Sequence, residues 1–171
     1  MPKKPLSEPV ASPVASPVAS PAIPLPALLL GVAGLIPFFA AGLAVWTPLL
    51  AEWRGIAGTF GITYGAIILS FLGGVRWGAA MQSGTNARPL ARPLSLSVTP
   101  ALLAYAVLIL PALPSAPLLL AVFHMIQGVD DIRAARAGDL PDWYAPLRAG
   151  LTIGASAALL SLFVFYAKAQ V

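Results

Sequence analysis

The sequence predicts an all-α protein, an integral membrane bundle of five transmembrane helices with its N-terminus inside and its C-terminus outside. The first observation is composition: 58% of the 171 residues are hydrophobic and 9% are charged, whereas soluble domains carry about 25% charged residues. The second is a series of long uncharged runs, and the third is a one-sided distribution of the few cations. A soluble fold of this size would have too little polar surface to cover so much apolar side chain, so several membrane spans explain the composition better.

The first two spans are predicted at about residues 25–46 and 58–81. No charge occurs from Gly55 to Val75, a run of 21 residues, and a transmembrane helix needs roughly 20 apolar residues. Pro37 lies inside the first span and should kink it, because proline removes a helical hydrogen bond. A membrane helix tolerates such a kink where neighbouring groups re-satisfy the freed carbonyl.

The third and fourth spans come from one uncharged run of 37 residues, from Pro93 to Val129. As a single helix this run would be about 55 Å long, nearly twice the roughly 30 Å of the hydrocarbon core. Three prolines at its middle, at positions 111, 114 and 117, force the chain to fold back. The expected result is a span over about 94–110, a tight turn, and a span over about 116–131.

Good helix formers follow the fourth span and predict that its helix continues as far as Gly138, where a glycine stop is expected. The next polar segment contains Trp143 and Tyr144, an aromatic pair typical of a membrane interface. The fifth span is predicted at about 148–167. A polar loop over 82–93 separates the second span from the third.

Cation distribution predicts the orientation, because five spans put the two termini on opposite sides. With the N-terminus inside, the inner segments hold seven cations: Lys3, Lys4, Arg88, Arg92, Arg133, Arg136 and Arg148. The outer segments hold two, Arg54 and Lys168, and Arg76 lies at the inner end of the second span. This excess of inner cations follows the positive-inside rule.

Residues 1–24 are predicted to be a disordered tail in front of a transmembrane domain over 25–171. Val10–Pro13 is repeated twice more, up to Pro21, and proline at every fourth position favours an extended, polyproline-like chain over a helix. The tail is expected to be a solvated tether, and a docking motif for another protein is the alternative.

Polar residues inside the spans define one candidate site. At 100° per residue, Arg76 shares a helical stripe with Gly61 and Gly65, a small-residue pattern that lets helices approach closely. In the fourth span, four residues fall on one helical face: His124, Gln127, Gly128 and Asp131. Asp130 falls off this face. Since Arg76 and Asp131 lie at matching depth, we expect them to pair, with His124 and Gln127 deeper along the same wall.

Two interpretations of this cluster stay open. The pair of Arg76 and Asp131 can be a structural ion pair that fixes helix register, with His124 as an interior imidazole. Alternatively, the cluster lines a cavity for an anionic headgroup or a quinone-like ligand, or a proton path, because ionisable residues inside membranes often mark such sites. One histidine with two aspartates is too small a ligand set for a transition metal, and the chain has no cysteine.

The run from Tyr64 to Gly78, YGAIILSFLGGVRWG, resembles the first signature of the transmembrane protein 69-like family. The segment Asp131–Gly138, followed by Pro141, Trp143 and Tyr144, resembles the second. The similarity covers about residues 30–166 and leaves the tail out. It implies a compact five-helix bundle in bacterial inner membranes or, in eukaryotes, mitochondria. It implies no biochemical activity and no catalytic residue.

The expected function is therefore that of a non-enzymatic accessory or assembly factor of an inner-membrane complex. The alternative is a small binder or carrier of a lipid, a quinone-like molecule or an anionic ligand. Membrane lipid and possible protein partners in the membrane are expected, and nucleic acid is not. No phosphate-binding loop, dinucleotide fingerprint or catalytic triad spacing occurs in the sequence, so no enzyme activity and no cofactor are expected.

Overall fold

The computed structural model describes residues 22–83, 90–110 and 115–169. These residues contain no strand, and most of them are helical. The elements, in order, are α1 (Leu25–Ala33), α2 (Ile36–Trp46), the 3-10 helix η1 (Pro48–Trp53), α3 (Arg54–Ser83), α4 (Ala91–Ile109), α5 (Ala116–Arg136) and α6 (Tyr144–Lys168). Residues 1–21 of the predicted tail, the middle of the 82–93 loop and residues 111–114 after α4 lie outside the described residues.

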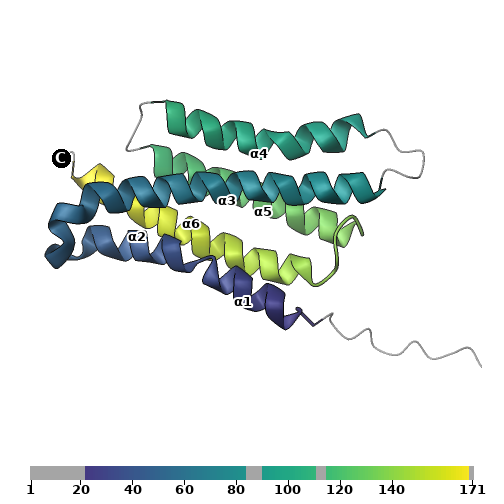
Figure 1. Ribbon diagram of the computed structural model, residues 1–171, viewed down its shortest axis with the longest axis horizontal. Helices are drawn as coiled ribbons and strands as arrows, with labels where there is room; N and C mark the ends of the chain where they lie inside the picture. Colours follow the sequence, from purple (N-terminus) through teal and green to yellow (C-terminus); the bar gives the residue numbers. More distant parts are fainter. Residues whose placement is uncertain (1–21, 84–89, 111–114, 170–171) are drawn as a thin grey trace, which may run out of the picture.

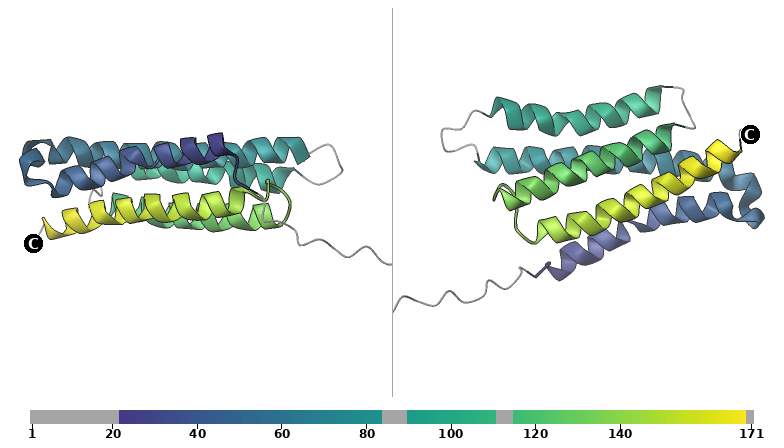
Figure 2. Two further views of the ribbon diagram at one scale, coloured as in Figure 1. Left: turned by 90° about the horizontal axis from the view of Figure 1, so that it is seen from below. Right: turned by 180° about the vertical axis from the view of Figure 1, so that it is seen from behind.

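The long helices run along a common axis and alternate in direction (Figures 1 and 2). α3 contacts α2, α4, α5 and α6, with α4 as its most extensive neighbour, while α5 packs most extensively on α6. α1 begins at one end of the bundle and α6 ends at the opposite end (Figure 1). An odd number of passes along the axis therefore separates the start of α1 from the end of α6.

The first predicted span is broken into α1 and α2 at Gly34 and Leu35. The break lies just before Pro37, at the start of α2, because the proline ring removes the bond to Ala33 and clashes with that carbonyl. The expected effect of Pro37 is thus observed, as a full interruption of the helix.

Three predicted spans are shorter than the helices observed. α3 covers Arg54–Ser83 instead of 58–81, α4 begins at Ala91 instead of residue 94, and α6 begins at Tyr144 instead of residue 148. The predicted ends followed the change from apolar to polar residues. The helices continue through such residues because backbone hydrogen bonding does not depend on side-chain polarity.

The end of α5 matches its prediction. α5 reaches Arg136, and Gly138 has a φ of 82°, a left-handed conformation that glycine adopts at little cost. The amide of Asp139 donates to the carbonyl of Ala134 at 3.0 Å, and the amide of Gly138 donates to that of Ala135 at 3.1 Å. This pair of bonds is a Schellman motif, and it turns the chain back toward α6.

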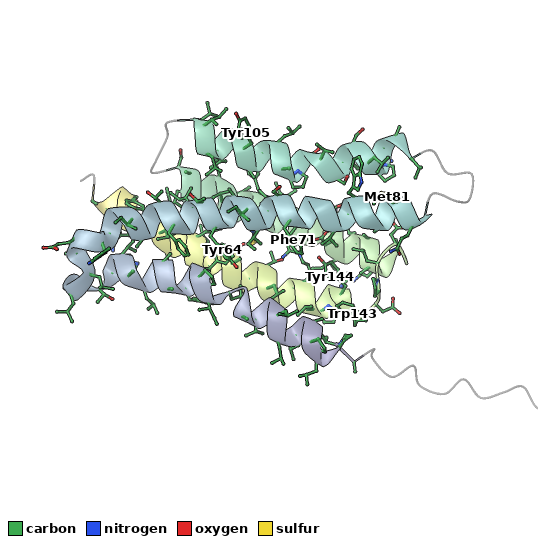
Figure 3. All side chains as sticks on the ribbon, viewed as in Figure 1. Tyr64, Phe71, Met81, Tyr105, Trp143 and Tyr144 are labelled. Atoms are coloured by element: carbon green, nitrogen blue, oxygen red, sulfur yellow. The ribbon has the colours of Figure 1, made fainter. Side chains whose placement is uncertain are left out.

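Large apolar side chains project outward along the bundle, as Phe71 and Tyr105 do in Figure 3. Four helical segments of the described residues are long and apolar enough to cross a membrane: Leu25–Trp46, Pro48–Gln82, Ala91–Ile109 and Tyr144–Lys168. α5 is not among them, since its polar and charged residues lower its hydropathy. Three of those polar residues, His124, Gln127 and Asp131, are buried together with Gly128, whereas Asp130 is partly exposed and Arg133 and Arg136 are exposed.

The glycine face of α3 is packed as its helical phase predicts. Gly61 and Gly65 are buried. A methyl group on Gly61 would lie 2.7 Å from Leu162 of α6 and 2.9 Å from Ala41 of α2. On another face of α3, a methyl group on Gly73 would strike the carbonyl oxygen of Ser97 in α4. Glycine therefore allows α3 to approach its neighbours closely on two sides.

Candidate functional site

The candidate site is centred on Asp131, whose side chain is fully buried. Arg148 of α6 donates through Nε to Asp131 Oδ2 at 2.8 Å. Gln127, one turn earlier in α5, donates through Nε2 to Asp131 Oδ1 at 2.9 Å. Arg76 Nε of α3 lies 4.0 Å from the same Oδ1. A buried carboxylate is costly unless it is paired and hydrogen-bonded, and here three helices supply the partners.

Arg76 lies beside Asp131, but Asp131 is not its nearest partner. Its Nη2 is 3.4 Å from Asp130 Oδ2, and its contact with Asp131 is at the outer limit of an ion pair. The Asp130 side chain is 49% exposed. The helical phase correctly placed Asp130 off the buried face, yet the long Arg76 side chain reaches both carboxylates.

Arg148 is the residue that sequence reasoning missed. It was counted as an inner-side cation at the start of the fifth span, but it lies inside α6 with 3% of its side chain exposed. Its role is to neutralise Asp131 within the bundle. The physical reason for the correction is that α6 begins one turn earlier than predicted, which carries position 148 into the helix interface.

A signal for Arg148 was present in the sequence. Asp131 lies nine residues before Leu140 and Arg148 lies eight residues after it, so a helical hairpin centred there puts the two residues opposite each other. The polar residues Arg148, Thr152 and Ser156 also recur every four positions, on one face of α6. The Ser156 hydroxyl donates to the carbonyl of Ala121 at 3.4 Å, which fits the same antiparallel register.

His124 shares the buried face with Gln127 and Asp131, as predicted, but it lies apart from the carboxylate. Its Nδ1 is 3.0 Å from the carbonyl oxygen of Leu120. A carbonyl only accepts, so Nδ1 carries the proton and Nε2 is left as an acceptor. The ring meets Phe38 of α2 edge-on, with centroids 5.8 Å apart. The structure brings Gln127 and Asp131 together and leaves His124 in apolar surroundings.

Among the described residues, three buried polar atoms of α5 and α6 have no hydrogen-bond partner: His124 Nε2, Arg148 Nη2 and Thr152 Oγ1. Thr152 packs against Gly128, where a methyl group would collide with it. Each of these atoms is free to bond a small polar molecule or a water. Within the described part of the chain, no group of three His, Cys, Asp or Glu side chains gathers as a metal site would require.

Comparison with known proteins identifies the family of this chain. A family model described as "Protein of unknown function (DUF3429)" matches residues 23–164. Transmembrane protein 69 of Xenopus tropicalis is 39% identical over 146 residues, which are 82% of this chain and 54% of that protein. Transmembrane protein 69 of Mus musculus is 36% identical over 91 residues, 50% of this chain and 34% of that protein.

The chain thus spans about half the length of the first relative and about a third of the second. No solved structure matches it. The names of both relatives and the four long apolar segments indicate a multi-pass membrane protein. Because the family model covers most of the sequence, the chain belongs to the transmembrane protein 69-like family, which contains the domain of unknown function DUF3429.

Proposed function

We propose that the chain is a non-enzymatic accessory or assembly factor of a complex in the bacterial inner membrane, or in the mitochondrial inner membrane if it is eukaryotic. One observation carries the proposal: both oxygens of the buried Asp131 carboxylate are engaged within the bundle, by Arg148 and Gln127. A charge that holds helices together in this way is not available to activate a substrate. The outward-facing side chains are largely apolar, which suits contact with lipid and with other membrane helices.

The proposal includes five membrane crossings with the N-terminus inside. α5 is expected to cross as an interior helix, because its polar face is buried while Met125 and Ile126 are 51% and 61% exposed. Arg148 no longer counts as a loop cation, which changes the inner cations from seven to six, against two outer ones. The positive-inside bias persists after this correction.

Reporter fusions test the orientation. A reporter inserted between α4 and α5 and a reporter after α6 should both be found outside, and a reporter between α3 and α4 should be found inside. The last position serves as the internal control. A cytoplasmic signal from either of the first two positions would overturn the orientation without affecting the proposed accessory role.

Purification of the tagged full chain from its native host in mild detergent tests the accessory role. We expect a membrane protein partner to co-purify in near-equal amount. When the partner carries the tag instead, it should in turn co-purify this chain. Deleting the chain should deplete the partner's complex on a native gel. A similarly abundant inner-membrane protein with the same tag is the control. A chain that runs alone, and whose deletion leaves membrane complexes unchanged, would overturn the role.

A second candidate function is binding of a small polar ligand between α5 and α6. The observation that favours it is the set of three unpartnered buried atoms on His124, Arg148 and Thr152. His124→Leu distinguishes the two functions. If His124 is only structural, the purified native chain should carry no bound molecule, and His124→Leu should change stability alone, through loss of the bond to Leu120 and the ring contact with Phe38. If a ligand is held, mass spectrometry of the purified protein should show a bound molecule that His124→Leu loses and Met125→Leu keeps.

A further inference from the structure

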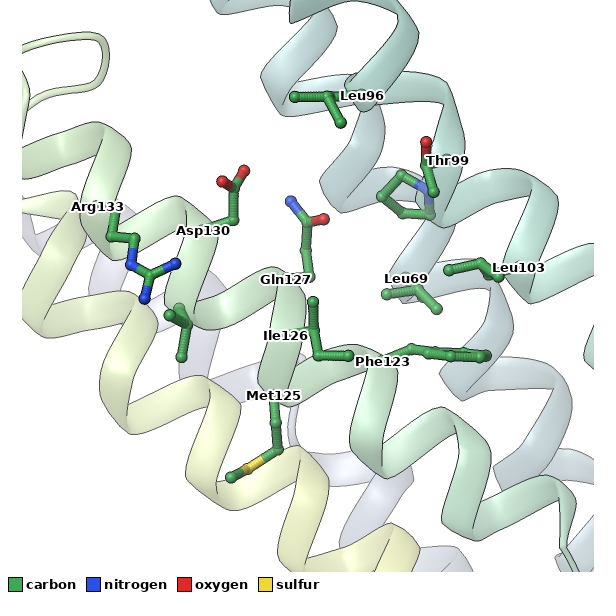
Figure 4. A pocket seen from close by; sticks show the side chains of 12 residues that line it. Leu69, Leu96, Thr99, Leu103, Phe123, Met125, Ile126, Gln127, Asp130 and Arg133 are labelled. Carbon is green, nitrogen blue, oxygen red and sulfur yellow. The ribbon is translucent and has the colours of Figure 1, made fainter.

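A groove opens between α4 and α5, on the side of α5 that faces away from Arg148 (Figure 4). α4 packs closely on α3, where Gly73 meets the backbone of Ser97, and makes much less contact with α5. The space left between them has a volume of about 530 Å³, with Leu69 of α3 at its base. This groove shares Gln127 with the buried cluster, whereas His124 and Asp131 face the interior of the bundle and do not line the groove.

The groove changes character along its length. Leu103 and Phe123 make one part apolar, while Gln127, Asp130 and Arg133 follow on successive turns of α5 at the other part (Figure 4). An apolar channel with a polar end suits an amphiphile. A transmembrane helix, about 10–12 Å across, does not fit in a groove of this volume, whereas an acyl chain does.

Charges at the polar end favour an anionic headgroup. Asp130 lies 3.4 Å from Arg76, and Asp131 is paired with Arg148. Arg133 is exposed and has no ion-pair partner within the described ranges. The polar end therefore has one cation that no protein carboxylate neutralises. Basic pockets between membrane helices on the cytoplasmic side are typical binding sites for anionic lipid headgroups.

We propose that the groove between α4 and α5 binds one anionic phospholipid of the cytoplasmic leaflet, with an acyl chain along Leu69, Leu103 and Phe123 and its phosphate at Arg133. The proposal rests on the membrane insertion and orientation proposed above, but not on the accessory role. The carboxylate of Asp130 repels the phosphate and directs it toward Arg133. Asp130 and Arg133 therefore act on the lipid with opposite signs.

Native mass spectrometry of the delipidated full chain tests the proposal, with dioleoyl phosphatidylglycerol as the probe and dioleoyl phosphatidylcholine as the neutral comparison. We expect one phosphatidylglycerol per chain, bound more tightly than phosphatidylcholine. Arg133→Gln should weaken phosphatidylglycerol binding by about tenfold, which corresponds to the loss of one hydrogen bond to a charged group. Asp130→Asn should leave binding equal or stronger.

Two matched controls distinguish binding in the groove from general electrostatic attraction of the anionic lipid to the protein surface. Arg136→Gln removes an exposed cation one turn further along α5, outside the groove, and should change binding little. Leu103→Trp fills the groove and should abolish binding, whereas Leu102→Trp, at a 64% exposed neighbour outside the groove, should not. Unfolding temperatures verify that each variant is folded.

Several results would overturn the proposal. Equal losses from Arg133→Gln and Arg136→Gln would show surface attraction in place of a site. Weaker phosphatidylglycerol binding in Asp130→Asn would contradict the repulsion between Asp130 and the phosphate. Binding that is indifferent to headgroup charge, or to Leu103→Trp, would exclude an anionic lipid in the groove. None of these measurements depends on a protein partner, so the outcome is separable from the accessory role.

Discussion

The two ends of the bundle are held together by different chemistry. At the Asp131 end, composed of Arg76, Gln127, Asp131 and Arg148, a fully buried carboxylate joins α3, α5 and α6 through ionic hydrogen bonds. The Trp46 end is composed of Trp46, Arg54, Phe165, Tyr166 and Lys168, and it joins α2, α3 and α6 through aromatic rings and backbone carbonyls. The cations at this end contact π-faces and carbonyl oxygens.

Each contact at the Trp46 end contributes only modestly to stability. Trp46 Nε1 donates to Ser161 Oγ at 2.9 Å, and Lys168 Nζ lies 5.6 Å from the Trp46 ring centroid. Arg54 donates to the carbonyl of Val45 at 3.0 Å and lies over Phe165, 5.5 Å from its centroid. Several of these side chains are exposed, so water or lipid headgroups can replace a contact that is lost.

This difference predicts where a substitution should lower the free energy of unfolding most. Breaking one side of a buried ion pair strands a charge, which water cannot reach. Breaking a contact at an exposed aromatic cluster costs only that contact. The Asp131 end should therefore respond steeply and cooperatively to substitution, and the Trp46 end in small, independent steps. Four predictions test this contrast.

The largest effect is expected for Asp131→Leu, which leaves Arg148 buried without its partner. We expect a loss of about 3–5 kcal/mol in the free energy of unfolding, and a similar loss for Arg148→Leu. The double variant should recover most of the loss, because no charge is then stranded. A double-mutant cycle by thermal or denaturant unfolding in detergent measures the coupling. Additive losses would show that the two side chains do not act as a pair.

The second effect tests the packing of the Trp46 end. A methyl group on Gly58 would overlap the Tyr166 ring, whose hydroxyl donates to the carbonyl of Arg54 at 3.2 Å. We expect Gly58→Ala to destabilise by about 1 kcal/mol, the low end of the range for overpacking, because only the far end of the Tyr166 side chain has to shift. Gly55→Ala is the control, since nothing lies within 4 Å of a methyl group there. Equal unfolding temperatures for the two variants would contradict the close approach of α3 and α6.

The third effect separates the two arginines that reach Asp131. Arg76→Leu should cost about 1 kcal/mol or less, as is usual for a partly exposed ion pair, because Arg148 still neutralises Asp131. Arg148→Leu should cost several times more. The unfolding midpoints of the two variants, compared under identical conditions, decide the question. Losses of equal size would mean that Arg76 is as important to the buried carboxylate as Arg148.

The smallest effect is expected for Lys168→Met, which keeps the apolar stem and removes the cation above Trp46. A cation–π contact at an exposed site contributes about 0.5–1 kcal/mol, so the unfolding temperature should fall slightly. Lys168→Arg keeps the cation and should restore the native value. The loss should be independent of Asp131→Leu. Strong coupling between these two substitutions would show that the ends of the bundle do not respond separately.

Much of the fold was predictable because membrane spans depend on local properties of the chain. Uncharged runs located the helices, prolines located the break before Pro37, and Gly138 located the end of α5. Helical phase also assigned the buried faces of Gly61 and Asp131 correctly. Helix ends were less predictable, because α3 and α6 continue through polar residues that a span-based boundary excludes.

The partner of Asp131 was harder to predict, because it depends on how two helices meet. The choice between Arg76 and Arg148 requires the antiparallel register of α5 and α6 and the distance from α3 to α5. Asp130 illustrates the same difficulty, since its position off the buried face did not indicate that Arg76 would reach it at 3.4 Å. The groove beside Asp130 also arises from the separation of α4 and α5, which no local pattern encodes.

The sequence by itself therefore determined the all-helical class, the approximate segments and the residues that face inward, because these follow from hydropathy, proline chemistry and the 3.6-residue helical period. Only the tertiary structure decided that Arg148 holds Asp131 at 2.8 Å while Arg76 remains at 4.0 Å. It also decided that His124 lies apart from the carboxylate. The physical reason is that a buried charge pairs with the cation that helix packing brings nearest, and packing is a property of the whole bundle.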